Sequence, residues 1–211
     1  MAVYLIEFRF QGYAKRYLKK IIFEVGRKFR VKGVTGKHVV PHITLFGPFS
    51  TRDEKKLVET FHRVLRKHNL YYFNLKGFSN FDKRVIFVDI KPSEELNELR
   101  QELAKELINL RSFLFFKTVK TKPFDYEEDF SFHATIAFKD IGNKFDRILN
   151  YLKHKAKPTI HQRLLRVTLL RNRKILHEYD FLQKRLLNGQ EALNRQVWKR
   201  TIELLKQNNP R

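Results

Sequence analysis

Apolar and polar positions follow two different periods along the chain, and this pattern predicts a mixture of strands and helices. Residues 3–10 form a run rich in aromatic and β-branched side chains, which is typical of a strand. Apolar residues then recur at helical spacing among lysines and arginines over residues 13–29, which predicts a helix with a basic outer side. The same reasoning predicts strands at 39–46, 70–78, 84–90 and 131–138, helices at 51–68, 93–110 and 143–154, a hairpin of 163–171 with 174–181 that turns at Asn172 and Arg173, and a terminal helix.

Two helices have recognisable N-cap residues, and the order of strands and helices is repeated along the chain. Thr51 with Glu54 three residues later has the form of a capping box, and Ser93 gives a second helix start. Residues 3–46 and 84–138 share the order strand, helix and then His-containing strand, which indicates an internal repeat. No Ser- or Pro-rich linker separates the two halves, so we expect two lobes that share one interface.

Positive charge dominates the composition. Lys and Arg number 44 against 22 Asp and Glu, and the formal net charge of +22 attracts polyanions such as RNA, DNA or an anionic membrane surface. The absence of cysteine excludes disulfides, thiolate nucleophiles and Cys-based zinc sites. Glu7 and Arg9 interrupt the first apolar run, so it is neither a signal-peptide core nor a spanning helix, and we expect a cytoplasmic protein.

Two strand-like stretches, "PHITLF" and "FHATIAF", each carry a His-x-Thr triplet. Because side chains alternate between the two sides of a strand, His42 and Thr44 share one side, as do His133 and Thr135. A polar pair in an otherwise apolar strand requires hydrogen-bond partners or a solvent-filled cleft, since an unsatisfied buried polar group costs about 1–3 kcal/mol. We therefore expect the two strands to face a common cleft.

Two histidines across a cleft can catalyse phosphodiester chemistry without a metal. With an ordinary pKa of about 6.5, one imidazole can accept a proton while the other donates one, which predicts a bell-shaped dependence of rate on pH. Each Thr hydroxyl can stabilise charge on a non-bridging phosphate oxygen. Other chemistries lack their motifs, because the sequence has no H-E-x-x-H zinc motif, no phosphate-binding glycine loop and no G-x-S-x-G elbow.

These two motifs, 91 residues apart, resemble the signature of the 2H phosphoesterase superfamily, and specifically its branch of RNA 2′,3′-cyclic phosphodiesterases, also called 2′-5′ RNA ligases. The resemblance implies an α+β fold of two pseudo-symmetric antiparallel sheets with outer helices around a central groove, spanning residues 1–182, followed by a basic C-terminal helical extension at 183–211. It implies hydrolysis of a cyclic phosphate at an RNA or nucleotide end without metal or other cofactor, commonly leaving a 2′-phosphate. His133 would activate water, and His42 would protonate the departing 3′-oxygen.

Four residues near the two motifs or the first lobe are candidates for contacts with the substrate. Many members of the family place an Arg shortly after the second motif, where Phe138 stands here. Phe138 and Phe46 are candidates for stacking on a base, and Tyr13 and Lys37 are further candidates near the mouth of the first lobe. The expected partner is RNA with a cyclic phosphate end, tRNA fragments included, bound by a monomer that does not associate with membranes.

Two alternatives stay open at this point. The chain could be an RNA-binding module without catalysis, which its charge and its basic terminal segment would serve, or an ATP-independent 2′-5′ RNA ligase that runs the same chemistry in reverse. A phosphoesterase for small cyclic nucleotides would share the site, but it would have less use for so large a positive charge.

Overall fold

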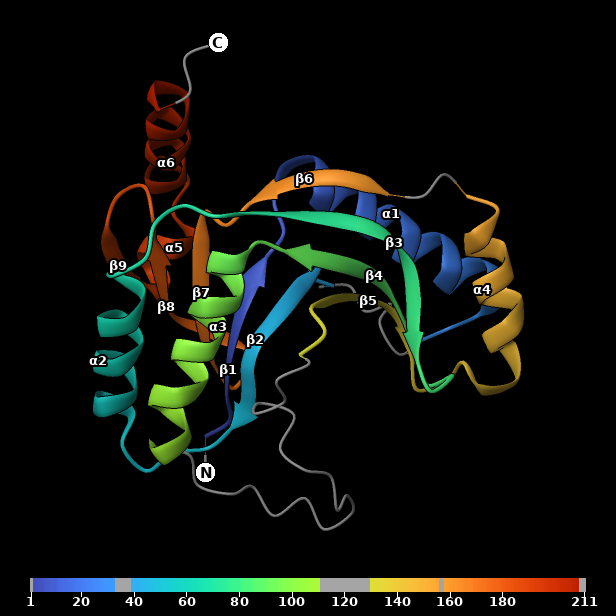
Figure 1. Cartoon of the computed structure of the whole chain (residues 1–211), viewed down its shortest axis with the longest axis horizontal. Coiled ribbons are helices and arrows are strands. Elements are labelled where there is room, and N and C mark those ends of the chain that lie inside the picture. The colour runs from blue at the N-terminus through green and yellow to red at the C-terminus, as the bar shows by residue number, and fades with distance from the viewer. Residues whose placement is uncertain (1, 33–38, 111–129, 156–157, 209–211) are drawn as a thin grey trace.

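The computed structural model describes residues 2–32, 39–110, 130–155 and 158–208. Its strands and α-helices follow the predicted order, with two further short strands and one further short helix (Figure 1). In chain order they are β1 Tyr4–Arg9, α1 Gly12–Phe29, β2 His42–Phe49, α2 Glu54–Leu65, β3 Tyr72–Phe81, β4 Val85–Pro92, α3 Glu94–Leu107, β5 His133–Phe138, α4 Phe145–Lys153, β6 Thr159–Arg163, β7 Arg166–Arg171, β8 Lys174–Asp180, β9 Arg185–Asn188, α5 Gly189–Leu193 and α6 Arg195–Gln207.

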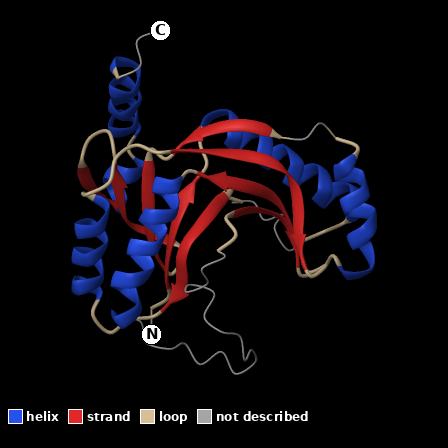
Figure 2. Ribbon diagram, viewed as in Figure 1, coloured by secondary structure: helices blue, strands red, loops and turns tan. Residues whose placement is uncertain are grey.

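The strands form two antiparallel sheets. The first has five strands in the order β2-β1-β7-β8-β9, and the second has four in the order β5-β4-β3-β6. Helices α2 and α3 pack side by side against the first sheet, and α1 and α4 lie along the second (Figures 1 and 2). The predicted α+β class with two antiparallel sheets and outer helices is confirmed.

The two motif-bearing strands occupy equivalent positions. β2 is an edge strand of the first sheet and β5 is an edge strand of the second, and the two strands are in contact with each other. Each pairs with one neighbour, β1 or β4, that is antiparallel to it. The topology therefore brings residues that are distant in the sequence to the junction of the two sheets.

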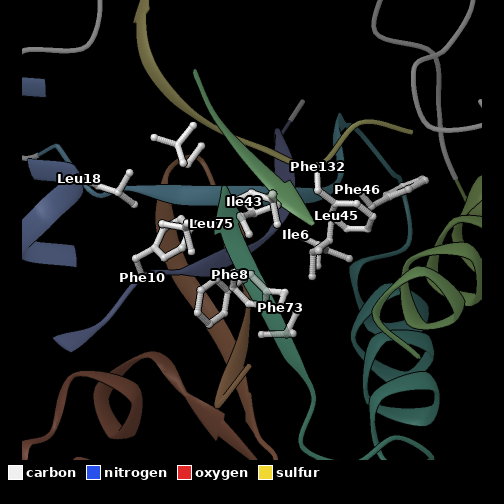
Figure 3. Packing of buried hydrophobic residues seen from close by; sticks show 14 of the residues in the cluster. Ile6, Phe8, Phe10, Leu18, Ile43, Leu45, Phe46, Phe73, Leu75 and Phe132 are labelled. Atoms are coloured by element: carbon white, nitrogen blue, oxygen red, sulfur yellow. The ribbon is translucent and has the colours of Figure 1, made fainter. Parts of the chain in front are cut away.

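Apolar residues on one side of β1 and β2 form the centre of the core (Figure 3). The rings of Phe8 and Phe73 meet edge to face with centroids 5.2 Å apart, and Phe10 packs against Phe8 at the same distance. This side also carries Ile6, Ile43 and Leu45, all fully buried. Because strand side chains alternate, the residues between them lie on the opposite side of the sheet.

Helix starts agree only in part with the sequence signals. Ser93 caps α3 as predicted, accepting a hydrogen bond from the backbone N–H of Leu96. The capping box predicted at Thr51 is wrong, because Asp53 is the N-cap of α2 and accepts from the N–H of Lys56 at 2.8 Å. Thr51 instead accepts a hydrogen bond from the N–H of Asp53.

The C-terminal segment is more closely joined to the first sheet than the sequence suggested. β9 adds a fifth strand to that sheet, so pairing continues to Asn188, past the expected boundary at residue 182. The terminal helix was predicted and corresponds to α6, whereas strands β6 and β9 were not predicted. Among the described residues, none of the helices has the length and apolar character needed to cross a membrane.

Candidate active site

The two His-x-Thr pairs lie at the junction of the sheets. His42 and Thr44 are in β2, and His133 and Thr135 are in β5. The imidazoles are close enough for positive charge on His42 to lower the pKa of His133. The structure thus brings the two predicted pairs together from opposite halves of the chain.

Each motif strand has a bulge directly after its threonine. In β2, Glu7 lies opposite Thr44 but Ile6 lies opposite Phe46, so Leu45 is the extra residue. In β5, Phe87 lies opposite Thr135 while Ile86 lies opposite Ala137, so the extra residue follows the threonine there as well. In both strands the alternation of side chains between the two sides of the sheet is therefore interrupted directly after the threonine of the motif.

These bulges decide the positions of the two candidate stacking residues. Strict alternation would place Phe46 beside Thr44, but the bulge turns it to the core, where it is fully buried against Phe49. The expectation that Phe46 contacts a base is therefore wrong. Phe138 lies opposite Val85, which puts it on the same side of the sheet as Thr135, and its side chain is half-buried.

The backbone orients both imidazoles in the same way. Nδ1 of His42 donates a hydrogen bond to the carbonyl oxygen of Val40 at 2.9 Å, and Nδ1 of His133 donates to that of Ser131 at 2.9 Å. A carbonyl oxygen only accepts, so each Nδ1 carries a proton. In the neutral ring Nε2 is then the proton acceptor, which leaves this atom of each histidine for chemistry.

Two aromatic rings pack against the imidazole of His133. Phe81 meets it edge to face at 4.9 Å between centroids, and Phe87 lies 5.2 Å away. Burial lowers the pKa of His133 below its usual value, the hydrogen bond to Ser131 opposes this effect, and the charge on His42 lowers the pKa further. His133 is thereby favoured in its neutral form.

His42 has a carboxylate as its neighbour instead. Oε2 of Glu7 lies 3.8 Å from Nε2 of His42, and the other oxygen of Glu7 accepts from Nε of Arg9 at 2.6 Å. Glu7 is only 3% exposed. Glu7 and Arg9 were not predicted as site residues, although two charged residues at alternate positions of an apolar strand are a signal for a polar side of the sheet.

Polar residues continue from Glu7 across the first sheet. Thr44, Glu7, Thr168 and Glu178 lie opposite one another on β2, β1, β7 and β8, and we call this side of the sheet the polar face. The hydroxyl of Thr168 donates to Glu178 at 2.7 Å. This face therefore carries the first His-x-Thr pair at one edge and a buried hydrogen-bond network further in.

Tyr13 and Lys37 were also predicted to contact the substrate. Tyr13 is 63% exposed in the first turn of α1 and lines a pocket together with Trp198 of α6. Lys37 lies outside the described residues. Within the described part of the chain, no group of three or more His, Cys, Asp or Glu side chains is arranged to hold a metal ion.

Two antiparallel sheets carry one His-x-Thr pair each at adjoining edges, as the resemblance to the 2H phosphoesterase superfamily implied. Residues 27–175 match the family model of the 2′-5′ RNA ligase superfamily, and the chain belongs to that superfamily. No curated protein matches the chain in sequence.

Solved structures are similar to this chain at low sequence identity, and the first of those described here shares its fold. The TT0787 protein of Thermus thermophilus is similar with a TM-score of 0.61 and 16% identity, over 85% of this chain and 97% of that one. Escherichia coli LigT complexed with 3′-AMP has a TM-score of 0.48 and 13% identity, over 87% and 90%. Usb1 of Kluyveromyces marxianus has a TM-score of 0.47 and 13% identity, over 89% and 97%.

Proposed function

We propose that the protein hydrolyses 2′,3′-cyclic phosphate at the ends of RNA, without a metal, and leaves a 2′-phosphate. The observation that carries this proposal is the matched pair of imidazoles. His42 and His133 are tied through Nδ1 to the carbonyl two residues before them, so both offer Nε2 to a reactant. Membership of the 2′-5′ RNA ligase superfamily agrees with a phosphodiester substrate.

The different surroundings of the two rings assign their roles. His133 has a lowered pKa and is the general base, whose Nε2 takes a proton from the attacking water. The water oxygen bonds to phosphorus as the bond to the 3′-oxygen breaks. Protonated His42, beside the carboxylate of Glu7, gives its Nε2 proton to that departing oxygen.

The threonine hydroxyls serve the phosphate itself. Thr44 and Thr135 follow the histidines by two residues on the same sides of their strands, so their hydroxyls donate to the non-bridging oxygens as negative charge gathers there. RNA is the favoured substrate class because the formal net charge of +22 supplies sequence-independent attraction to a phosphate backbone.

The test uses a short RNA that ends in a 2′,3′-cyclic phosphate, incubated with the protein in EDTA. His42→Gln and His133→Gln should each reduce kcat by about 10²–10⁴-fold, the usual contribution of a general acid or base. His154→Gln is the matched control, since its Nδ1 also bonds a backbone carbonyl, that of Asn150, but it lies at the exposed end of α4.

Phosphorus NMR of the product identifies which ester bond was broken. A 2′-phosphate supports the roles given above, and a 3′-phosphate would require the bond to the 2′-oxygen to break instead. Turnover that survives both histidine substitutions would overturn the proposal. RNA binding by a wild-type protein that turns nothing over would favour a non-catalytic RNA-binding module.

A further inference from the structure

A pocket of about 790 Å³ opens beside the strand pair that carries His42. One of its lining residues, Arg9, lies directly opposite His42 in the pairing of β1 with β2. The β7–β8 hairpin and α5 form the rest of the wall. The polar and exposed lining side chains are three cations, two amides and one leucine: Arg9, Arg173, Lys174, Asn188, Gln190 and Leu193.

This pocket lies on the polar face of the first sheet. Arg166 lies on that face, two residues before Thr168, and it donates a hydrogen bond to the carbonyl of Ala192 in α5. Helix α5 therefore covers the same face that carries Arg9. Helix α2 packs on the opposite face, where the ring of Tyr179 contacts His62. The pocket and the first His-x-Thr pair are thus on one side of the sheet.

The cation at the hairpin turn occupies an unfavourable position. Asn172 and Arg173 have φ values of 49° and 67°, the conformation of a turn that prefers Asn followed by Gly. Asn172 satisfies this preference, but Arg173 has a Cβ atom that the left-handed region disfavours. The turn therefore holds Arg173 at the wall of the pocket in a backbone conformation that Gly would adopt with less strain.

We infer that this pocket binds the RNA backbone upstream of the cyclic phosphate, so that the enzyme prefers an oligonucleotide to a mononucleotide. This inference rests on the proposed function, in which the cyclic phosphate at the end of the same RNA is the group that reacts. From β2 to β8 there are three strand spacings, or about 14 Å, which exceeds the reach of a single nucleotide. The lining cations, Arg9 on β1 and Arg173 and Lys174 at the β7–β8 hairpin, are spaced along this path and match a chain of phosphates. The pocket volume lies in the usual range for ligand sites.

Binding is measured with a single-stranded pentanucleotide that ends in a 3′-phosphate, which the enzyme cannot hydrolyse. Arg173→Gly with Lys174→Gln should weaken binding about 10-fold at low salt. The plot of log Kd against log salt concentration should become less steep by about 1.4, because each lost single-strand phosphate contact contributes about 0.7. Arg173→Gly suits the turn, so a loss of affinity without a loss of thermal stability is expected.

Lys83→Gly is the matched control. Asp82 and Lys83 form a turn with positive φ values of 44° and 56° between β3 and β4, in the other sheet. This substitution removes one positive charge from the same kind of turn position but does not touch the pocket. An equal loss of affinity in Lys83→Gly and Arg173→Gly would show general electrostatic attraction and overturn the inference.

Catalysis separates this inference from the proposed function. The double variant should keep kcat/KM for a 2′,3′-cyclic mononucleotide within about 2-fold while losing about 10-fold on a pentanucleotide with a cyclic phosphate end. A wild-type protein that hydrolyses neither substrate would refute the proposed function, and the binding data would still decide the inference. A wild-type protein that uses both substrates equally well would refute the inference alone.

Discussion

Replacing Arg166 with methionine should destabilise the fold far more than an ordinary arginine substitution. Arg166 is 2% exposed at the start of β7. Its Nε donates to Asp180 at 2.8 Å, its Nη1 to Glu178 at 3.2 Å and its Nη2 to Thr201 of α6 at 2.7 Å. The guanidinium also lies 4.8 Å from the ring centroid of Trp198, so this one side chain joins the first sheet to the terminal helix.

The cost follows from what the substitution leaves behind. Removing Arg166 would leave the buried carboxylates of Glu178 and Asp180 without their cationic partner. Removing one partner of a buried ion pair costs about 3–5 kcal/mol of stability. For a domain of this size each kcal/mol shifts Tm by about 2–4 °C, so Arg166→Met should lower Tm by about 6–20 °C. Arg171→Met is the control, since Arg171 is on the same strand but half-exposed, and a surface ion pair such as its contact with Glu54 contributes about 0–1 kcal/mol.

The loss of stability caused by Arg166→Met should also depend on pH. Burial raises the pKa of Glu178 above its usual value, while its hydrogen bond from Thr168 and the charge of Arg166 oppose that rise. A carboxyl whose pKa is raised in the folded state binds protons more tightly when folded, so its contribution to stability falls as pH rises above 4.5. Without Arg166 the pKa of Glu178 rises further, and the variant should therefore recover part of its stability when the pH is lowered from neutral toward 5.

Thermal and urea unfolding of wild type, Arg166→Met and Arg171→Met at neutral and mildly acidic pH provide the measurement. Equal stability of the two variants would contradict the assignment of Arg166 as the buried link to α6. A deficit of Arg166→Met that grows at acidic pH would contradict the account given for Glu178.

Three further outcomes follow from the site. As pH falls, kcat/KM should decline with a midpoint below pH 6.5, because burial lowers the pKa of His133. Phe81→Ala should move this midpoint to higher pH, because water would then reach the imidazole. Thr44→Val and Thr135→Val should each lower kcat by about 10²–10³-fold with Tm little changed, and equal kcat in all three proteins would exclude the hydroxyls as oxyanion donors. Gly189→Ala should lower Tm, because a Cβ there would lie 2.6 Å from a backbone carbonyl oxygen of β8, and an unchanged Tm in a thermal melt would show that α5 can shift away from the sheet.

Periodicity was sufficient to predict most of the elements, since their apolar positions are set by one packed face. It missed β6 and β9, whose residues show little alternation because both are short edge strands. The capping signal at Thr51 failed because Asp53 offers a better placed acceptor two residues later. The side chain of Asp53, and not that of Thr51, therefore marks the start of α2.

The motif itself was recognisable, but its surroundings were not. Pairing register decides that Phe46 is buried and that Phe138 shares the side of Thr135, and a bulge is not visible in an apolar run such as "HITLF". Glu7 and Arg9 acquire their meaning from the strand placed opposite them. These residues become part of the site only through long-range pairing, which local sequence patterns do not specify.

The two halves of the site share a backbone design and differ in its environment. Both histidines have the same Nδ1 hydrogen bond and the same bulge after the threonine, so a symmetric site would leave the direction of proton transfer undefined. Phenylalanine rings around His133 disfavour its charged form, whereas a buried carboxylate beside His42 offers an ion-pair partner to the protonated ring. In our proposal this difference sets which imidazole is base and which is acid, and therefore which oxygen of the cyclic phosphate departs.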